Sequence, residues 1–144
     1  MRRTLVRGAL GLVVALLGFA GFTLWALESG AVVVVETRDG EGATRETRVW
    51  FVERDDGLWI EAGTPENPWF VDVLREPSLT LRGDKVAGRY RALPQPNPEG
   101  HRRIRAWLRE KYGIRDAWVA FVFDTERSIA VRLEPLPGAD APPS

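Results

Sequence analysis

The chain has 144 residues, of which 44% are apolar and 28% are charged, a composition typical of a globular protein. Cysteine is absent, which excludes disulfides, iron–sulfur clusters and thiol nucleophiles. The single histidine, His101, argues against a histidine-based metal site and against a serine–histidine–aspartate triad. With no cysteine and one histidine, we expect no metal site. Twenty basic and twenty acidic residues balance to a net charge of zero, so we expect no nucleic-acid partner.

The N-terminal segment has three arginines followed by uncharged, mostly apolar residues at positions 8–27. As an α-helix rising about 1.5 Å per residue, this run would be roughly 30 Å long, the thickness of a membrane's hydrocarbon core. We therefore predict that residues 1–30 form a single-pass membrane anchor, and the arginines slightly favour a cytoplasmic N-terminus. The alternative is a signal peptide cleaved at the small residues 29–31, after which the rest of the chain is exported.

Short strands separated by turns are predicted from residue 31 onward. They are recognised by β-branched runs, by alternation of apolar and polar residues, and by turn sequences such as RDDG and GD. The predicted strands are residues 31–37, 45–53, 58–63, 78–82, 85–93 and 127–135.

The second of these strands predicts which residues share a face. Because successive side chains of a strand point to opposite faces, Thr47, Val49 and Phe51 lie on one face. Arg48 and Trp50 lie on the other. The two faces therefore differ in character, one apolar and one carrying a cation beside an aromatic ring.

Two helices are predicted between the strands. Trp69, Phe70, Val73 and Leu74 fall at helical spacing before Pro77, which ends the first helix. The second helix spans residues 98–112.

In the second helix, Asn97 is the expected N-cap and Gly113 the expected residue after the C-terminus. Its buried stripe is predicted to contain Ile104, Trp107, Leu108 and Tyr112, and its opposite side, with Arg102, Arg105 and Arg109, to be solvated. Residues 115–124 are ambiguous between a short helix and a strand.

These elements predict an α+β protein: a small antiparallel split β-barrel at residues 31–135, with two or three short helices. One N-terminal transmembrane helix precedes it. The tail at residues 136–144 is predicted to be flexible.

Four stretches carry a resemblance to a known family: RETRVWFVERDDG, AGTPENPWFVDVLREP, RIRAWLREKYGIRDAW and DTERSIAVRLEP. Over residues 33–135 the chain resembles the deazaflavin-dependent nitroreductase and quinone reductase family, whose split barrel is shared with FMN-binding oxidases. The resemblance implies hydride transfer from reduced deazaflavin coenzyme F420 to a quinone or nitroaromatic, a lipophilic small-molecule acceptor. Such chemistry resides in the cofactor, so few catalytic side chains are needed.

The resemblance also implies roles for particular residues. Arg45 and Arg48 would face the cofactor phosphates, because a guanidinium group is a suitable donor to them. Thr64, Asn67 and the amides at the next helix N-terminus would bind the remaining oxygens. Three aromatic residues would flank the ring system or the substrate: Trp50 and Trp69 would contact the cofactor, and Tyr112 the substrate.

The first turn, RDGEGATRE, departs from the basic phosphate-binding sequence usual in the family. Asp39, Glu41 and Glu46 stand there, and carboxylates repel a polyanionic cofactor tail. FMN, which carries less negative charge, or no redox cofactor therefore stay open as alternatives. The second function class is a non-catalytic split-barrel module that binds a flavin-like or lipophilic ligand or a protein partner.

Overall fold

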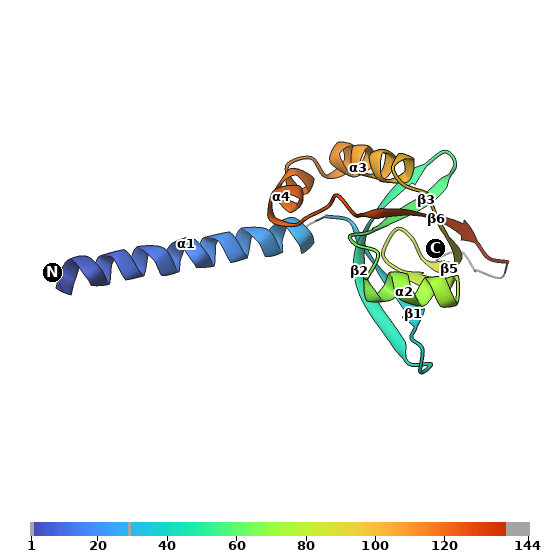
Figure 1. Cartoon of the computed structure of the whole chain (residues 1–144), viewed down its shortest axis with the longest axis horizontal. Coiled ribbons are helices and arrows are strands. Elements are labelled where there is room, and N and C mark those ends of the chain that lie inside the picture. The colour runs from blue at the N-terminus through green and yellow to red at the C-terminus, as the bar shows by residue number, and fades with distance from the viewer. Residues whose placement is uncertain (1, 29, 138–144) are drawn as a thin grey trace.

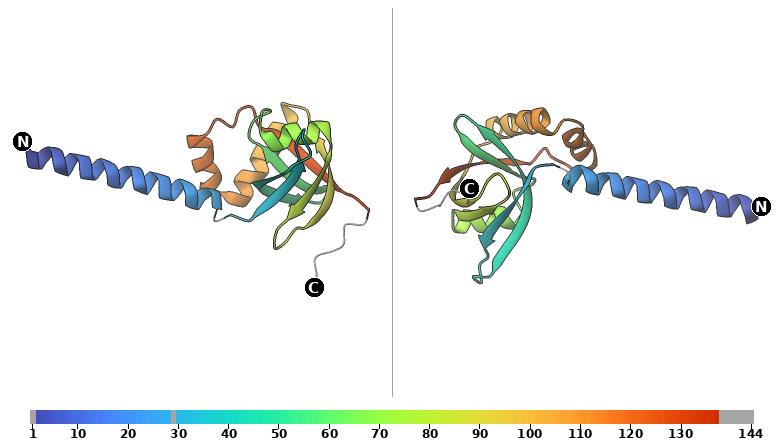
Figure 2. Two further views of the ribbon diagram at one scale, coloured as in Figure 1. Left: turned by 90° about the horizontal axis from the view of Figure 1, so that it is seen from below. Right: turned by 180° about the vertical axis from the view of Figure 1, so that it is seen from behind.

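The structure, a computed structural model of the whole chain, describes residues 2–28 and 30–137. A long helix, α1 (Arg2–Glu28), projects away from a barrel of six strands, around which three shorter helices are arranged (Figures 1 and 2). Of the tail predicted to be flexible, residues 138–144 lie outside the described residues.

The barrel consists of antiparallel strands that close on themselves in the order β1-β2-β3-β6-β5-β4. This arrangement confirms the predicted antiparallel barrel, and every predicted strand is present with ends that differ by a few residues. Their bounds are β1 (Val32–Arg38), β2 (Thr44–Arg54), β3 (Gly57–Ala62), β4 (Ser78–Arg82), β5 (Gly88–Pro94) and β6 (Ile129–Pro135).

The barrel interior is filled by the apolar face of each strand. In β2, Val49 and Phe51 are buried in the core while Trp50 on the opposite face is only half-buried, as the two-residue period predicts. The helix α2 (Pro68–Arg75) follows β3 and adds Trp69 and Phe70 to the same core. The residues before α2 therefore hold a fixed position against the barrel.

A second core lies outside the barrel, where α3 (Glu99–Tyr112) packs against β2, β3 and β6. Ile104, Leu108 and Tyr112 are buried there, as the helical spacing predicts. Gly113 ends the helix with a φ of 54°, a conformation that favours glycine. The predicted N-terminus is corrected by one residue, because α3 begins at Glu99. Pro98 occupies the N-cap position, and the Asn97 side chain, one residue earlier, still accepts a hydrogen bond from the His101 amide in the first turn.

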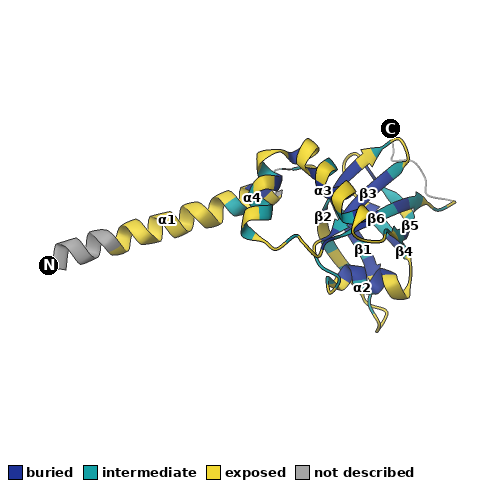
Figure 3. Cartoon of the chain, turned by 45° about the horizontal axis from the view of Figure 1, so that its top comes forward, coloured by how far each residue is buried: buried dark blue, intermediate teal, exposed yellow. Residues whose placement is uncertain are grey.

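The ambiguous segment after α3 is helical and forms α4 (Ile114–Val122). It is helical because its apolar residues pack on α1, rather than pairing in the barrel: the Trp118 ring lies 4.7 Å from that of Phe22 between centroids. Figures 1 and 3 show α4 beside the barrel-proximal end of α1.

From Ala9 to Phe22, the side chains of α1 are exposed (Figure 3). Its segment Ala9–Leu27 has a mean hydropathy of 2.2 over 19 residues, with 6% buried. By length and composition it could cross a membrane, and a signal sequence meets the same criterion. A helix so exposed is not a core helix of this domain.

Candidate functional site

The main apolar cavity of the described residues has a volume of about 640 Å³ and lies beside β2. One wall is the β2 face that carries Arg48 and Trp50. The turn between β3 and α2 supplies Thr64 and Asn67. A further wall is formed by Leu27 at the end of α1, by Val119 of α4 and by Phe123 just after α4. Four of the seven residues that the resemblance singles out thus lie around one cavity of the size usual for small ligands.

Arg45 lies apart from this cavity, because its guanidinium binds a buried carboxylate. Arg45 Nε donates a hydrogen bond of 2.8 Å to Asp72 Oδ2, and Thr37 Oγ1 donates one of the same length to that oxygen. Arg75 Nη1 lies 3.8 Å from the other oxygen. The arginine joins β2 to α2, and its contacts explain its position without a cofactor.

Trp69 and Tyr112 are also held within the protein. Trp69 is 0% exposed in the barrel core, and its Nε1 has no hydrogen-bond partner among the described residues. The Tyr112 hydroxyl donates to the carbonyl of Ala31 at 2.6 Å and lies 3.1 Å from that of Phe51. Burial raises the pKa of Tyr112 to about 12, so the hydroxyl keeps its proton at neutral pH.

Trp50 connects the cavity to these structural contacts. Its ring stacks on that of Tyr112, with centroids 4.5 Å apart and planes at 12°. Its Nε1 donates a 3.2 Å hydrogen bond to the carbonyl of Leu27, at the end of α1. Trp50 is therefore fixed in orientation on the cavity wall, and it couples α1 to the barrel.

Behind the cavity lies a buried ionic cluster that the sequence did not reveal. Arg105 Nη1 donates to Glu61 Oε2 at 2.9 Å, and Nη2 donates to Asp116 Oδ1. The prediction that Arg105 is solvated is wrong, because it lies between these two carboxylates with its side chain 10% exposed. Burial raises the pKa of Glu61, although the positive charge of Arg105 lowers it.

The charges on the cavity wall limit the ligand. Glu61 and Asp124 supply two acidic groups, and Arg48 supplies the one basic group among the described wall residues. The wall therefore suits an uncharged ring system with a few hydrogen-bonding groups. It does not match a polyanionic tail, which would have to lie outside the cavity, where salt screens repulsion.

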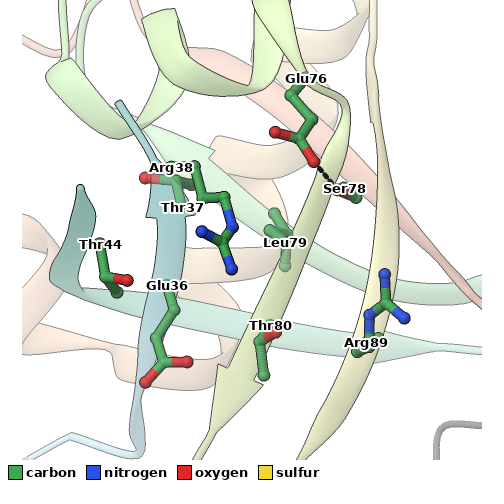
Figure 4. Close-up of a pocket in the computed structure, with 9 residues that line it drawn as sticks. All are labelled: Glu36, Thr37, Arg38, Thr44, Glu76, Ser78, Leu79, Thr80 and Arg89. Atoms are coloured by element: carbon green, nitrogen blue, oxygen red, sulfur yellow. Dashed lines mark hydrogen bonds between the residues drawn. The ribbon is translucent and has the colours of Figure 1, made fainter. Parts of the chain in front are cut away.

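A second cavity, of about 380 Å³, lies on the barrel surface between β1 and β4 (Figure 4). Its wall is polar and carries Arg38 and Arg89 together with Glu36 and Glu76. These charges cancel, and Glu76 already accepts a hydrogen bond from Ser78 Oγ at 2.9 Å. The groove therefore offers no net attraction for an anion and is not the candidate site.

The acidic first turn has a structural explanation. Asp39 Oδ1 accepts hydrogen bonds of 2.9 Å from the backbone amides of Glu41 and Ala43, and these bonds lower the pKa of Asp39. The carboxylate shapes the turn between β1 and β2. A loop held in this way presents an anion where the resembling family presents cations.

The closed antiparallel barrel with its short helices places the chain in the split-barrel fold class. Comparison with protein-family models and with curated proteins gives no match. Among solved structures, the chain is similar to the heme storage protein HutZ of Vibrio cholerae, with 12% identity, a TM-score of 0.59, and coverage of 85% of this chain and 92% of that one.

Two further structures share the fold. An F420 reductase is 13% identical, with a TM-score of 0.50 over 78% of this chain and 92% of that one. A conserved hypothetical protein of Mycobacterium tuberculosis is 17% identical, with a TM-score of 0.54 over 87% and 92% of the two chains. At these identities the similarity shows the fold alone.

Proposed function

We propose that this protein is a membrane-tethered oxidoreductase that transfers hydride from reduced coenzyme F420 to a lipophilic quinone or nitroaromatic. The observation that carries the proposal is the cavity where Arg48, Trp50, Thr64 and Asn67 meet an otherwise mainly apolar wall. The family resemblance of the sequence and an F420 reductase of the same fold support it. The apolar α1 supports the tether.

The chain would contribute binding and orientation. Bound F420 would supply the hydride, and the protein would place the reacting groups against a mainly apolar wall. Trp50, fixed by Tyr112 and by the Leu27 carbonyl, offers a flat face for an aromatic ring. Arg48 and the polar groups of Thr64 and Asn67 would hold the oxygens of the ring system.

The test uses the full chain in detergent micelles. Oxidised F420 and FMN are titrated separately, and binding is followed by cofactor absorbance and fluorescence, with empty micelles as the blank. The reduced form of the bound cofactor is then mixed with menadione, and reoxidation is followed optically. The expected result is saturable binding of F420 and reoxidation that depends on the protein. If FMN alone binds saturably, FMN replaces F420 as the proposed cofactor.

A non-catalytic module that binds a lipophilic ligand is the second candidate function. The acidic first turn and the presence of a single basic group, Arg48, on the described cavity wall favour it, because an anionic cofactor needs more positive charge. Binding of menadione to the protein without binding of either cofactor is the outcome that supports this candidate and rejects the reductase.

A further inference from the structure

Outside α1, the exposed large apolar side chains of the described residues are concentrated in and just after α4. Ile114 is 71% exposed, Phe121 78% and Phe123 46%, and the one other such residue is Leu74 on α2. Ile114 and Phe121 are seven positions apart, so they lie on the same face of a helix. We call Ile114 and Phe121, together with Phe123 just after the helix, the α4 apolar face. Large exposed apolar side chains that cluster in this way mark an interaction site.

This face is held at a defined level along α1. The Trp118 ring contacts those of Phe19 and Phe22, with centroids 5.2 and 4.7 Å apart. Trp118 Nε1 donates a 3.0 Å hydrogen bond to Thr23 Oγ1. Closer to the barrel, Ala26 is 0% exposed. These contacts place α4 beside residues 19–26 of α1.

Those residues belong to the segment that could cross a membrane. The 19 residues of Ala9–Leu27 form a helix of about 28 Å, while the hydrocarbon core is about 30 Å thick. The apolar segment is no longer than the hydrocarbon core is thick. If α1 spans the bilayer, all of the segment is therefore needed to cross it, and residues 19–27 lie within the bilayer. Trp118 then lies roughly 6 to 12 Å along α1 from Leu27, within the membrane boundary.

The charges near α4 fit this depth. The Arg115 guanidinium lies 5.1 Å from the Trp25 ring, a pairing of cation and tryptophan suited to the headgroup region. Arg109 at the end of α3 is 71% exposed and adds a second cation, although its Nε also lies 3.8 Å from Asp116 Oδ2. Asp124 and Glu126 follow α4 on the chain, after the apolar face has ended. A lipid surface matches this order of apolar and cationic groups.

We propose that α4 is an interfacial membrane helix whose apolar face inserts into the leaflet around the barrel-proximal end of α1. This inference rests on the membrane anchor in the proposed function. Since Leu27, Val119 and Phe123 also line the main cavity, that cavity lies at the level of the interface. Its lipophilic ligand therefore enters from the bilayer.

The experiment measures depth in the membrane with the full chain in liposomes of phosphatidylcholine and phosphatidylglycerol. The protein has no cysteine, so Phe121→Cys, Leu17→Cys and Leu74→Cys each accept a single fluorescent label. All three native side chains are exposed, which keeps loss of packing small. Leu17 on α1 reports the anchor. Leu74 on α2 is the control, because α2 packs on the barrel away from α1 and α4 (Figure 1).

Brominated lipids and aqueous iodide serve as the two quenchers. Loss of fluorescence with brominated lipid at Leu17 and Phe121, but with iodide at Leu74, is the expected result. Lipid quenching at Leu17 with iodide quenching at Phe121 overturns the α4 inference and leaves the anchor intact. Shielding of Phe121 from both quenchers indicates a covering protein surface, such as a second copy, and also overturns it. Iodide quenching at all three positions rejects the anchor itself.

Discussion

Replacement of Arg105 by methionine tests the buried ionic cluster, because it removes the cation and keeps a side chain of similar length. Glu61 and Asp116, whose side chains are 12% and 0% exposed, then lose their shared partner, and Asp116 keeps the exposed Arg109 guanidinium at 3.8 Å. Removing one member of a buried ion pair costs about 3–5 kcal/mol. With a urea dependence of about 2 kcal/mol per M, the unfolding midpoint should fall by about 1.5–2.5 M.

The assay is urea unfolding of the full chain in nonionic micelles, followed by tryptophan fluorescence. Arg102→Met is the matched control, since Arg102 pairs with Glu99 on the surface of the same helix, with side chains 65% and 66% exposed. It should cost at most about 1 kcal/mol. Adding Asp116→Asn to Arg105→Met should restore part of the loss. Equal midpoints for the Arg105 and Arg102 variants would refute the reasoning.

Four further outcomes are expected. Burial raises the folded-state pKa of Glu61 above its ordinary value of 4.5. The folded protein therefore binds this proton more tightly than the unfolded chain does, and the protein loses stability as pH rises from about 4.5 through the folded-state pKa. Glu61→Gln should therefore gain stability relative to the wild type across that window, and a constant difference in urea midpoint would contradict the shift. Tyr112→Phe should lower the free energy of unfolding by about 1–2 kcal/mol, because it leaves the Ala31 carbonyl without its donor; an unchanged melting temperature would contradict this contact. Arg45→Ala should lower the melting temperature by leaving Asp72 with one partner fewer, whereas cofactor affinity in the folded variant should be unchanged. Arg48→Ala should weaken cofactor binding by about 10- to 150-fold, because it removes a contact of about 1.5–3 kcal/mol. The exposed Arg91→Ala is the control, and equal dissociation constants for the two variants would show that Arg48 does not contact the cofactor.

The strands of the barrel were predicted correctly from the sequence, because strand alternation and turn signals involve residues that are close together in the chain. The alternation around Val49 and Phe51 identifies the inner face of β2, and Gly113 identifies the end of α3. The predicted position of Asn97 was wrong by one residue: Pro98 is the N-cap, although the Asn97 side-chain oxygen still accepts from the His101 amide in the first turn. Helix ends are sensitive to such single contacts.

The ionic cluster could not be predicted in the same way. Arg105 lies on the polar side of a helix, and its partner Glu61 is 44 residues away along the chain. Only the packing of α3 across β3 brings them together. α4 was ambiguous for the same reason, because its apolar residues pack on α1, almost a hundred residues earlier in the chain. The sequence also gives no sign that Arg45 pairs with Asp72, 27 residues away, because that contact depends on how α2 packs.

Closure of the barrel depends on a short seam. β1 pairs with β2 through seven residue pairs, but with β4 through three, which are Val34–Arg82, Val35–Leu81 and Glu36–Thr80. Local opening should therefore cost least there, and amide protons along this seam should exchange with solvent sooner than those between β1 and β2. An opened seam would uncover two strand edges that can pair with another chain. Aggregation of the partly unfolded protein should accordingly begin at β1 and β4.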